Sequence, residues 1–501
     1  MNTMKKPSIA VIGGGFGGIY AAIKIKQVLG ISAQIFEASE DIGGAWFANS
    51  YPNCGCDIPS HLYSLSSDPN PNWSQLYASR DEIHDYIQDV ARKHDLYRHT
   101  LLQTKVIKSE WVAESRKWKL DLLDCSNEGY RDLESVFYDF VFLCVGSIRV
   151  PLIPEQFKQF SGNVVHTAYW DPSIDFTNKR VAVIGNGASA VQVIPSVAQQ
   201  ASQLYSYQRS VSWCTLRKQY SYSAFMKFIF KWIPLVALIY RLYLFLEIEL
   251  GFMSTYKNYN SLGARRYRKK LEIEMRNRIE KQGRPDLVDV LIPDFAPGCK
   301  RLAISDNFIE ALCQDNVVVQ TNRVKKVKGR TIITEDADEQ EFDLLVLATG
   351  FNVAGFLGHL EVYGKPEQSL NKAWENEFPG LYKSTLMSGY PNMFMILGPS
   401  SYPGTNSALY MGESQVNYSV ELIKKMLKDK ITAVEPLKEA QDKCVEKLKT
   451  GFEKTVWKGG CTSWYMNKQG DITTFWNGTS LEFSWMLRPA TSYDDFLVYR
   501  K

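Results

Sequence analysis

The sequence lacks the features of several protein classes. Its most apolar stretch is interrupted by Lys231, Pro234 and Arg241, so no run reaches the roughly eighteen residues of a membrane-spanning helix. Lysine and arginine form no long basic run, and the formal net charge is only +4 over 501 residues; we therefore expect no nucleic-acid partner. There are only six histidines. Neither a Ser-His-Asp arrangement nor a His-rich metal spacing is present, so we expect no metal.

Cysteine is sparse and shows no paired spacing. The nine cysteines form no C-x-x-C motif, and Cys54 and Cys56 flank Gly55 too closely for a metal site or a comfortable disulfide. The chain runs from "MNTMKKP" into an apolar strand without a signal-peptide core. We therefore expect a reducing, cytoplasmic compartment.

The first segment has the pattern of a dinucleotide-binding βαβ unit. A β-branched run over residues 9–12 meets Gly13, Gly15 and Gly18 in G-x-G-x-x-G spacing, and a second strand ends on Glu37. These glycines allow, in turn, a tight turn, close approach to a pyrophosphate and close packing of helix on strand. Glu37 is placed to bind a ribose hydroxyl. A plain glycine-rich turn is the alternative, but the coincidence of all these signals favours a cofactor.

A second unit follows with a different ending. Its strand over residues 181–184 leads to Gly185, Gly187 and Ala190, and the next strand, "QLYSYQRS", ends near Arg209 rather than an acid. A guanidinium pairs with a 2'-phosphate, which favours NADP(H) over NAD(H). The alternative is one functional site with a decayed copy. The intact turns instead predict FAD in the first unit and NADPH in the second.

These patterns predict an α/β fold with two Rossmann-like dinucleotide-binding domains, for FAD and NADPH, and a helical insert in the second. The predicted parts are residues 1–150 (FAD-binding domain), 151–210 (linker and NADPH-binding domain), 211–298 (insert), 299–390 (second part of the NADPH-binding domain) and 391–501 (C-terminal part of the FAD-binding domain).

The insert begins with the strongly apolar stretch "SAFMKFIFKWIPLVALIYRLYLFLEIELGF". It is interpreted either as a buried cap helix, which is favoured, or as a helix on a membrane surface. The stretch also indicates a lipophilic substrate or access from a membrane, so peripheral membrane contact stays an alternative to a purely cytoplasmic enzyme.

The order of these features resembles one enzyme family over nearly the whole chain. The linker "FSGNVVHTAYWD" places Phe160, Gly162, His166, Trp170 and Asp171 at every fixed position of the pattern F-x-G-x-x-x-H-x-x-x-W-[P/D]. In this the chain is similar to the class B flavin-dependent monooxygenases of the Baeyer-Villiger type. Relatives that oxygenate only soft heteroatoms usually carry another residue in place of the tryptophan.

A second family pattern, [A/G]-G-x-W-x-x-x-x-[F/Y]-P-[G/M]-x-x-x-D, is met by "GGAWFANSYPNCGCD". The match implies that Trp46 belongs to the cofactor site and that Asp57 ends the motif. Asn53 stands where the family has Gly or Met. Since Asn tolerates the left-handed backbone region, we expect the turn to keep its shape.

A third match, "GCKRLAISDN", carries a Lys-Arg pair. By resemblance, Lys300 helps to bind the 2'-phosphate and Arg301 is the catalytic residue over the flavin. A C4a-peroxyflavin attacks a ketone only as its anion, so a permanent positive charge beside it is needed. Asp57 is the candidate carboxylate that orients the guanidinium.

His166 and Trp170 lie where the two units must move relative to each other. His166 is interpreted either as an acid or base or, preferably, as part of a hinge in which Gly162 bends the chain.

The predicted function is an NADPH- and O2-dependent flavoprotein monooxygenase that inserts oxygen beside the carbonyl of a lipophilic ketone to give an ester or lactone. Two alternatives remain open: an enzyme that oxygenates nitrogen or sulfur, and a non-catalytic flavin-binding protein.

Overall fold

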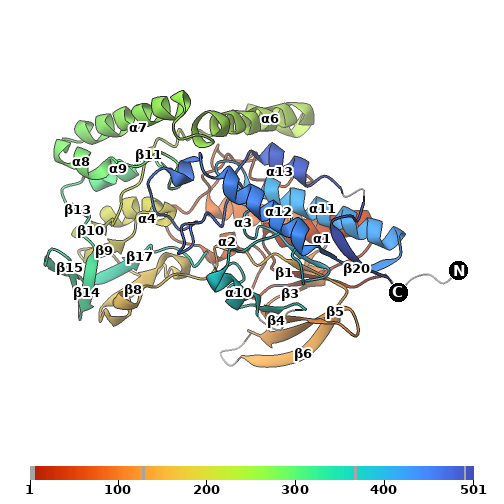
Figure 1. The fold of residues 1–501 in the computed structure, drawn as a ribbon. Helices are drawn as coiled ribbons and strands as arrows, with labels where there is room; N and C mark the ends of the chain where they lie inside the picture. The colour runs from red at the N-terminus through yellow and green to blue at the C-terminus, as the bar shows by residue number, and fades with distance from the viewer. Residues whose placement is uncertain (1–5, 127–129, 354, 366–368, 490–491, 501) are drawn as a thin grey trace.

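The computed structural model describes residues 6–126, 130–353, 355–365, 369–489 and 492–500. Two parallel five-stranded sheets form its frame (Figure 1). The first has the order β19-β7-β1-β2-β3, built from β1 (Ile9–Ile12), β2 (Gln34–Phe36), β3 (Thr100–Leu101), β7 (Phe140–Leu143) and β19 (Met393–Met395). The second has the order β13-β10-β9-β17-β8, built from β8 (Asn163–His166), β9 (Arg180–Ile184), β10 (Gln203–Tyr207), β13 (Val317–Gln320) and β17 (Leu344–Leu347). The predicted α/β class with two Rossmann-like units is confirmed.

The first strand of each motif ends in a glycine that no other residue could replace without strain. Gly13 has φ of 110°, and a Cβ atom there would stand 2.3 Å from the carbonyl oxygen of Cys144. Gly185 repeats this arrangement, with φ of 116° and a Cβ position 2.4 Å from the carbonyl oxygen of Ala348. Because Cys144 and Ala348 directly follow β7 and β17, the glycines let each turn lie against the neighbouring strand. Helices α1 (Phe16–Leu29) and α4 (Ala188–Ala198) then begin at the sheet edge.

Alternate side chains of β1 face two different layers, as expected for a buried strand. Ile9 and Val11 join a core cluster with α1 and with α11 (Ala408–Lys428). Ala10 and Ile12 pack instead toward a four-stranded sheet of order β18-β4-β5-β6. That sheet consists of β18 (Glu361–Tyr363), β4 (Thr104–Val112), β5 (Lys117–Asp124) and β6 (Arg131–Tyr138). The second sheet is covered likewise, by α4 and α9 (Phe308–Leu312) on one face and by β14 (Val324–Lys328), β15 (Thr331–Thr334) and β16 (Glu339–Glu341) on the other.

Strand β18 departs from the predicted division of the chain. Residues 299–390 are predicted to complete the second unit, but Glu361 of β18 is in parallel register with Lys108 of β4. Val362 is fully buried in the same cluster as Ala10 of the first sheet. The chain therefore returns to the first unit before residue 361 rather than at residue 391. A three-residue strand is too short for its apolar pattern to indicate which sheet it joins.

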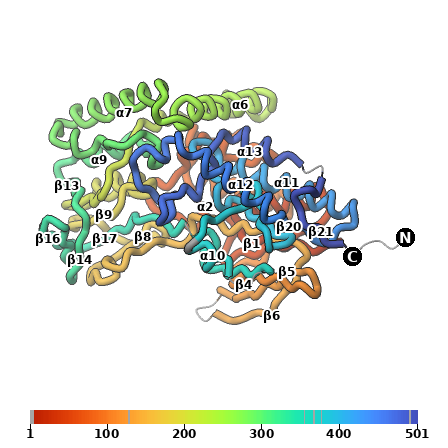
Figure 2. Tube along the Cα trace, viewed as in Figure 1, coloured from red at the N-terminus to blue at the C-terminus, as the bar shows by residue number. Residues whose placement is uncertain are grey.

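The helical insert lies across both units. Its helices are α5 (Ala224–Trp232), α6 (Pro234–Gly251), a π-helical turn (Phe252–Tyr256), α7 (Leu262–Lys281) and α8 (Val288–Leu291). Phe245 of α6 joins the core of the first unit, whereas Met275 of α7 joins the core of the second. Figures 1 and 2 show α6 and α7 end to end along one side of the molecule.

The apolar stretch is not a buried cap. Helix α6 buries only Leu244, Phe245 and Glu249, and most of its remaining apolar side chains are exposed, so the favoured interpretation was wrong on this point. Within the part of the chain that the structure describes, no single helix is long and apolar enough to cross a membrane. Helices α5 and α6 pass that test only as a pair, and a bend of 108° separates them.

The remaining elements complete the surface around the two sheets. They are α2 (Ala45–Ala48), α3 (Arg80–Lys93), α10 (Leu370–Asn376), α12 (Lys438–Gly451) and α13 (Ser480–Met486), together with the strand pairs β11 (Cys214–Thr215) with β12 (Ala303–Ile304) and β20 (Ile431–Pro436) with β21 (Phe496–Arg500). Short 3-10 turns cover Tyr97–His99, Glu155–Gln159, Thr167–Tyr169, Pro285–Leu287 and Val456–Lys458.

His61 is buried in an aromatic box beneath the insert, and this gives a pH prediction. Its ring contacts Tyr222, Phe230 and Tyr240 at centroid distances of 5.1, 4.7 and 5.3 Å, and its Nε2 atom has no hydrogen-bond partner among the described residues. Burial, assisted by the charge of Arg241, lowers the pKa of His61 to about 4.

Between pH 6.5 and 4, His61 is protonated in the unfolded chain but stays neutral in the folded protein. The group therefore leaves stability intact above pH 6.5 and removes up to about 3 kcal/mol of it as the pH falls to 4. His61→Phe keeps the aromatic packing, so its unfolding free energy should fall less steeply over this range than that of the wild type. Thermal unfolding of both proteins at each pH measures the difference, and parallel curves would refute the assignment.

Candidate active site

The first glycine-rich turn presents free backbone donors. Gly15 is the N-cap of α1 and provides no side-chain hydrogen bond to the helix, so the first N–H groups of α1 are available to a phosphate. A Cβ atom on Gly15 would stand 3.5 Å from the Cα atom of Gly44, which itself has φ of 56°. Two glycine backbones thus line a narrow cradle that a side chain would fill. Gly18 lies where α1 packs most closely on the preceding turn: a Cβ atom there would stand 1.9 Å from the carbonyl oxygen of Gly13.

Glu37 follows β2 and is held at the edge of this cradle. Its Oε2 atom accepts a hydrogen bond from the Gly14 N–H at 2.7 Å, and its Oε1 atom accepts one from the Ser39 N–H at 2.8 Å. Each carboxylate oxygen keeps a further lone pair for a ribose hydroxyl. The cradle, the uncapped helix and the anchored carboxylate together fit the phosphates and ribose of FAD.

The loop of residues 43–57 connects the two units. Trp46 donates from its Nε1 atom to the hydroxyl of Tyr63 at 3.2 Å. Asn53 has φ of 60°, so the left-handed turn expected at this position is confirmed. Its neighbour Tyr51 donates to Gln192 of α4 at 2.9 Å, and Gln192 donates back to the carbonyl oxygen of Gly55 at 2.9 Å. These bonds hold the end of the loop, and thus Asp57, between the units.

Arg301 forms an ion pair with Asp57 across this junction. The Nε and Nη2 atoms of Arg301 lie 2.8 and 2.7 Å from the same Oδ2 atom of Asp57. Burial opposes the charge of Arg301, but the Asp57 carboxylate outweighs it and raises the pKa of the guanidinium above its ordinary value. Both side chains remain about one-third exposed. The arrangement therefore holds a permanent cation with part of its surface open to a ligand.

The second glycine-rich turn is also open. Helix α4 begins at Gly187 without a side-chain cap, and a Cβ atom on Gly187 would meet nothing within 4 Å. Ala190, in the first turn of α4, is fully buried and occupies the position of the third glycine. The turn therefore has space and free N–H groups for a second pyrophosphate.

Two cations lie beside that turn. Arg209 follows β10 and is exposed, and Lys300 donates to the hydroxyl of Ser210. The Nζ atom of Lys300 lies 5.0 Å from the centre of the Phe295 ring. Burial and then the positive charge of Arg209 lower the pKa of Lys300. Two mutually repelling cations beside an open helix terminus fit a phosphate, as the 2'-phosphate of NADPH would supply.

The linker motif is assembled around β8. Phe160 is buried, and a Cβ atom on Gly162 would stand 2.7 Å from its ring. Trp170 stacks on Phe176 with ring centres 5.7 Å apart, and the Oδ1 atom of Asp171 accepts the N–H of Ser173 at 2.8 Å. These four positions of the pattern thus each contact another residue of the same linker.

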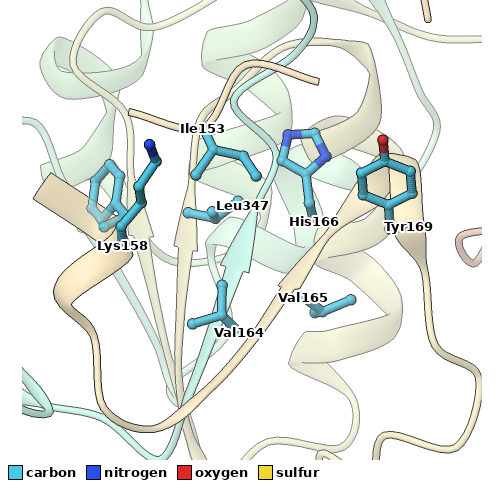
Figure 3. A pocket seen from close by; sticks show the side chains of 8 residues that line it. Ile153, Lys158, Val164, Val165, His166, Tyr169 and Leu347 are labelled. Carbon is cyan, nitrogen blue, oxygen red and sulfur yellow. The ribbon is translucent and has the colours of Figure 1, made fainter. Parts of the chain in front are cut away.

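His166 connects β8 to the "ATG" segment, residues 348–350, that directly follows β17. Its Nδ1 atom accepts the N–H of Ala168 at 3.0 Å, and its Nε2 atom lies 3.2 Å from Oγ1 of Thr349, just beyond β17. Burial lowers the pKa of His166. Its ring lies beside Tyr169 (Figure 3), and both residues line a surface hollow of about 380 Å³. Neither Arg301 nor Asp57 lines this hollow, so His166 lies apart from the ion pair.

The comparisons with known proteins agree with this geometry. The family model described as flavin-binding monooxygenase-like matches residues 5–238. A Baeyer-Villiger monooxygenase of Streptomyces coelicolor is 32% identical, over 95% of this chain and 89% of that protein. One of Pseudomonas aeruginosa is also 32% identical, over 98% of this chain and 90% of that protein. The chain belongs to the Baeyer-Villiger monooxygenases. It is a flavoprotein enzyme with FAD and NADPH as cofactors.

Solved structures give the same result for this Baeyer-Villiger monooxygenase. A steroid monooxygenase bound to NADP superposes with a TM-score of 0.83 at 25% identity, covering 99% of both chains. OTEMO in complex with FAD and NADP superposes with a TM-score of 0.84 at 25% identity, covering 99% of this chain and 100% of that one.

Three contacts near Arg301 are not predicted by the sequence pattern. In this Baeyer-Villiger monooxygenase Cys299 forms a disulfide with Cys461, which the expectation of a reducing compartment did not include. Tyr465 donates to the carbonyl oxygen of Cys299. The ring of Tyr256 lies against Gly298, where a Cβ atom would stand 2.4 Å from it. The partners are 42 to 166 residues apart in the chain, so no local pattern indicates them.

Asp57 is expected to act through Arg301 in this Baeyer-Villiger monooxygenase. Asp57→Asn keeps an oxygen acceptor but removes the charge, so the guanidinium should lose its fixed position. We expect the fraction of NADPH converted to oxygenated product to fall about ten- to a hundredfold, with flavin reduction by NADPH unchanged. Asp343→Asn, which alters a surface ion pair with Arg330, is the matched control. Equal product yields in wild type and Asp57→Asn would remove Asp57 from this role.

Proposed function

We propose that this enzyme inserts one atom of O2 beside the carbonyl of a lipophilic ketone, giving an ester or lactone, and that Arg301 is its catalytic residue. The overall balance consumes one ketone, one O2, one NADPH and one proton, and yields the ester, NADP⁺ and water. The observation that carries the residue assignment is the Arg301–Asp57 ion pair at the junction of the two nucleotide-binding units.

Different residues of the chain have different roles in the proposed reaction. Bound FAD, reduced by NADPH, supplies the electrons that activate O2. Arg301 provides a fixed positive charge that stabilises negative charge developing on oxygen, and Asp57 orients the guanidinium. Because the Asp57 carboxylate raises the pKa of Arg301 above its ordinary value, the guanidinium stays charged near neutral pH. Gly13, Gly15, Gly18 and Glu37 are proposed to bind the FAD phosphates and ribose, with Trp46 beside them.

The NADPH site is assigned to the second turn. Gly187, through the N-terminus of α4, is proposed to bind the pyrophosphate, with Gly185 forming the turn and Ala190 packing the helix on the sheet. Arg209 and Lys300 are proposed to bind the 2'-phosphate. Lys300 adjoins Arg301 in the chain, so the same segment serves both cofactor binding and catalysis.

The linker motif is assigned a positioning role. His166 is buried and keeps a lowered pKa, so it stays neutral near pH 7 and bridges β8 to Thr349. Phe160, Gly162, Trp170 and Asp171 stabilise the bends on either side. The linker is thus suited to act as a hinge between the two units, rather than as an acid or base.

Product analysis with heavy-isotope O2 tests the proposal. The holoenzyme, NADPH and a panel of lipophilic ketones should give esters that carry one heavy oxygen atom, detected by mass spectrometry. Labelled sulfoxides or amine oxides, with no ester from any ketone, would make the enzyme a heteroatom oxygenase. Tightly bound FAD without NADPH-dependent product from any substrate would favour the non-catalytic alternative.

A further inference from the structure

The outward face of α6 is apolar along its whole length. Its exposed side chains recur at helical spacing, and the most accessible reach 63% exposure at Leu235 and 69% at Leu250. The set on this face is Leu235, Leu238, Ile239, Leu242, Leu246 and Leu250. Glu247 lies at its margin and is the exposed charge of the described helix. A contiguous apolar face of this size is rare on a soluble monomer and indicates an interaction site.

The other two charged residues of α6, Arg241 and Glu249, face the protein instead. Arg241 donates to the backbone and side-chain oxygens of Ser64 at 2.9 and 3.2 Å. Glu249 is buried and accepts a hydrogen bond from Asn406 at 2.7 Å. An ordinary surface helix has its apolar stripe toward the core and its charges outward. Helix α6 is apolar on both sides: Leu244 and Phe245 pack into the core, and the outer face is apolar as well. An apolar outer face is favourable where it meets an apolar medium.

Aromatic side chains surround the apolar face. Trp232, at the end of α5, and Trp485, in α13, are each 65% exposed, and α13 adjoins α6 through the hydrogen bond from the Leu481 N–H to Glu249 at 3.4 Å. Phe225, Phe228 and Tyr243 are also more than half exposed. Tryptophan and tyrosine at the edge of an apolar surface are typical of proteins that lie at a membrane–water interface.

Basic side chains continue the same side of the molecule. The exposed face of α7 carries several cations and one acid, Glu280, which lies 3.9 Å from Arg276. The cations include Arg265, Arg266, Lys269, Lys270 and Arg276. Helix α7 extends directly beyond α6 (Figure 2). Helix α5 adds Lys231, also exposed. The inner face of α7, with Leu271 and Met275, is buried in the protein. The apolar helix is thus followed by a cationic helix, complementary to anionic phosphates next to a hydrocarbon layer.

From this arrangement we infer that α5, α6, α7 and Trp485 form a docking face for an anionic phospholipid bilayer. The apolar side of α6 lies at the boundary of the acyl chains, and the basic side of α7 contacts the headgroup phosphates. A second copy of the chain would match the apolar helix alone, whereas a phospholipid bilayer supplies both the apolar layer and the anionic phosphates that the cations of α7 complement. The charge pattern therefore favours the bilayer over self-association.

The docking face adjoins the segment that carries Arg301. Helix α6 ends in the π-helical turn Phe252–Tyr256, and the ring of Tyr256 lies against Gly298, three residues before Arg301. If the proposed ketone oxygenation holds, on which this step rests, docking brings a lipophilic substrate dissolved in the bilayer to the side of the enzyme next to the segment that carries Arg301. Docking itself does not depend on that activity.

Vesicle flotation of the holoenzyme tests the docking face. The wild type should float with phosphatidylcholine vesicles that contain about 30% phosphatidylglycerol, and at least about tenfold less should float with pure phosphatidylcholine or in about 1 M NaCl. Leu238→Glu with Leu242→Glu should reduce flotation at least about tenfold. Lys269→Glu with Lys270→Glu should reduce it on the anionic vesicles alone.

The controls separate docking from folding and from catalysis. Leu101→Glu with Leu497→Glu alters two exposed leucines elsewhere and should float like the wild type. Each variant should retain FAD and its NADPH oxidation rate in solution. The inference is overturned if the wild type does not float with either vesicle, if the α6 variant floats as well as the wild type, or if the α6 substitutions instead dissolve a dimer seen by light scattering. Ester formation plays no part in these outcomes, so flotation and the proposed oxygenation fail independently.

Discussion

Replacing Arg301 with alanine should abolish ester formation while NADPH oxidation continues. The guanidinium is the fixed cation of the candidate site, and removing a group that stabilises developing charge on oxygen typically lowers the rate about a hundredfold or more. Arg301 contacts Asp57 rather than the glycine-rich turns, so both cofactors should still bind. The electrons from NADPH should then appear as hydrogen peroxide, measured against ester by gas chromatography and a peroxide assay.

Two comparisons sharpen this result. Arg301→Lys retains a positive charge but not the planar group that reaches Asp57 through two nitrogens, so it should recover only part of the product. Arg330→Ala removes an arginine from a surface ion pair and should leave the product yield unchanged. Ester yields from Arg301→Ala within about twofold of the wild type would exclude Arg301 as the catalytic residue.

Replacing Arg209 or Lys300 with alanine should weaken NADPH selectively. Each side chain is proposed to make a charge-assisted hydrogen bond to the 2'-phosphate, which contributes about 1.5–3 kcal/mol. The KM for NADPH should therefore rise about ten- to a hundredfold in each variant. NADH lacks the phosphate, so its KM should change by less than about twofold. Steady-state kinetics with both nucleotides measures this ratio.

The double variant provides a further check. Burial and then the positive charge of Arg209 lower the pKa of Lys300, so the two cations interact. The loss of NADPH binding free energy in the double variant should therefore differ from the sum of the two single losses. An equal rise in KM for NADPH and NADH would mean that these residues support the fold of the turn instead of recognising the phosphate.

Much of the frame could be predicted because its signals are local. The strand of residues 9–12, its three glycines and Glu37 lie within one short segment, and the structure places them in one βαβ unit. Gly185 repeats the backbone geometry of Gly13. The pair of Asp57 with Arg301 spans 244 residues, and only the resemblance to a known family brought these two positions together.

Other features depend on which surface each side chain faces, and sequence pattern does not encode that alone. The apolar content of α6 is equally compatible with a buried helix. Its orientation is visible only in the fold, where Phe245 is buried in the core and Arg241 and Glu249 make inward hydrogen bonds. Cys299 and Cys461 are brought together by the fold of distant segments. Strand β18 is too short for its pattern to name its partner sheet.

The most direct test of the central claim is the amount of ester formed per NADPH oxidised by the wild-type holoenzyme, measured across ketones of increasing chain length. The account predicts that this ratio approaches one ester per NADPH for long-chain ketones, with little hydrogen peroxide. A ratio near zero for every ketone, with NADPH consumed as peroxide or with a sulfide oxygenated instead, would contradict it.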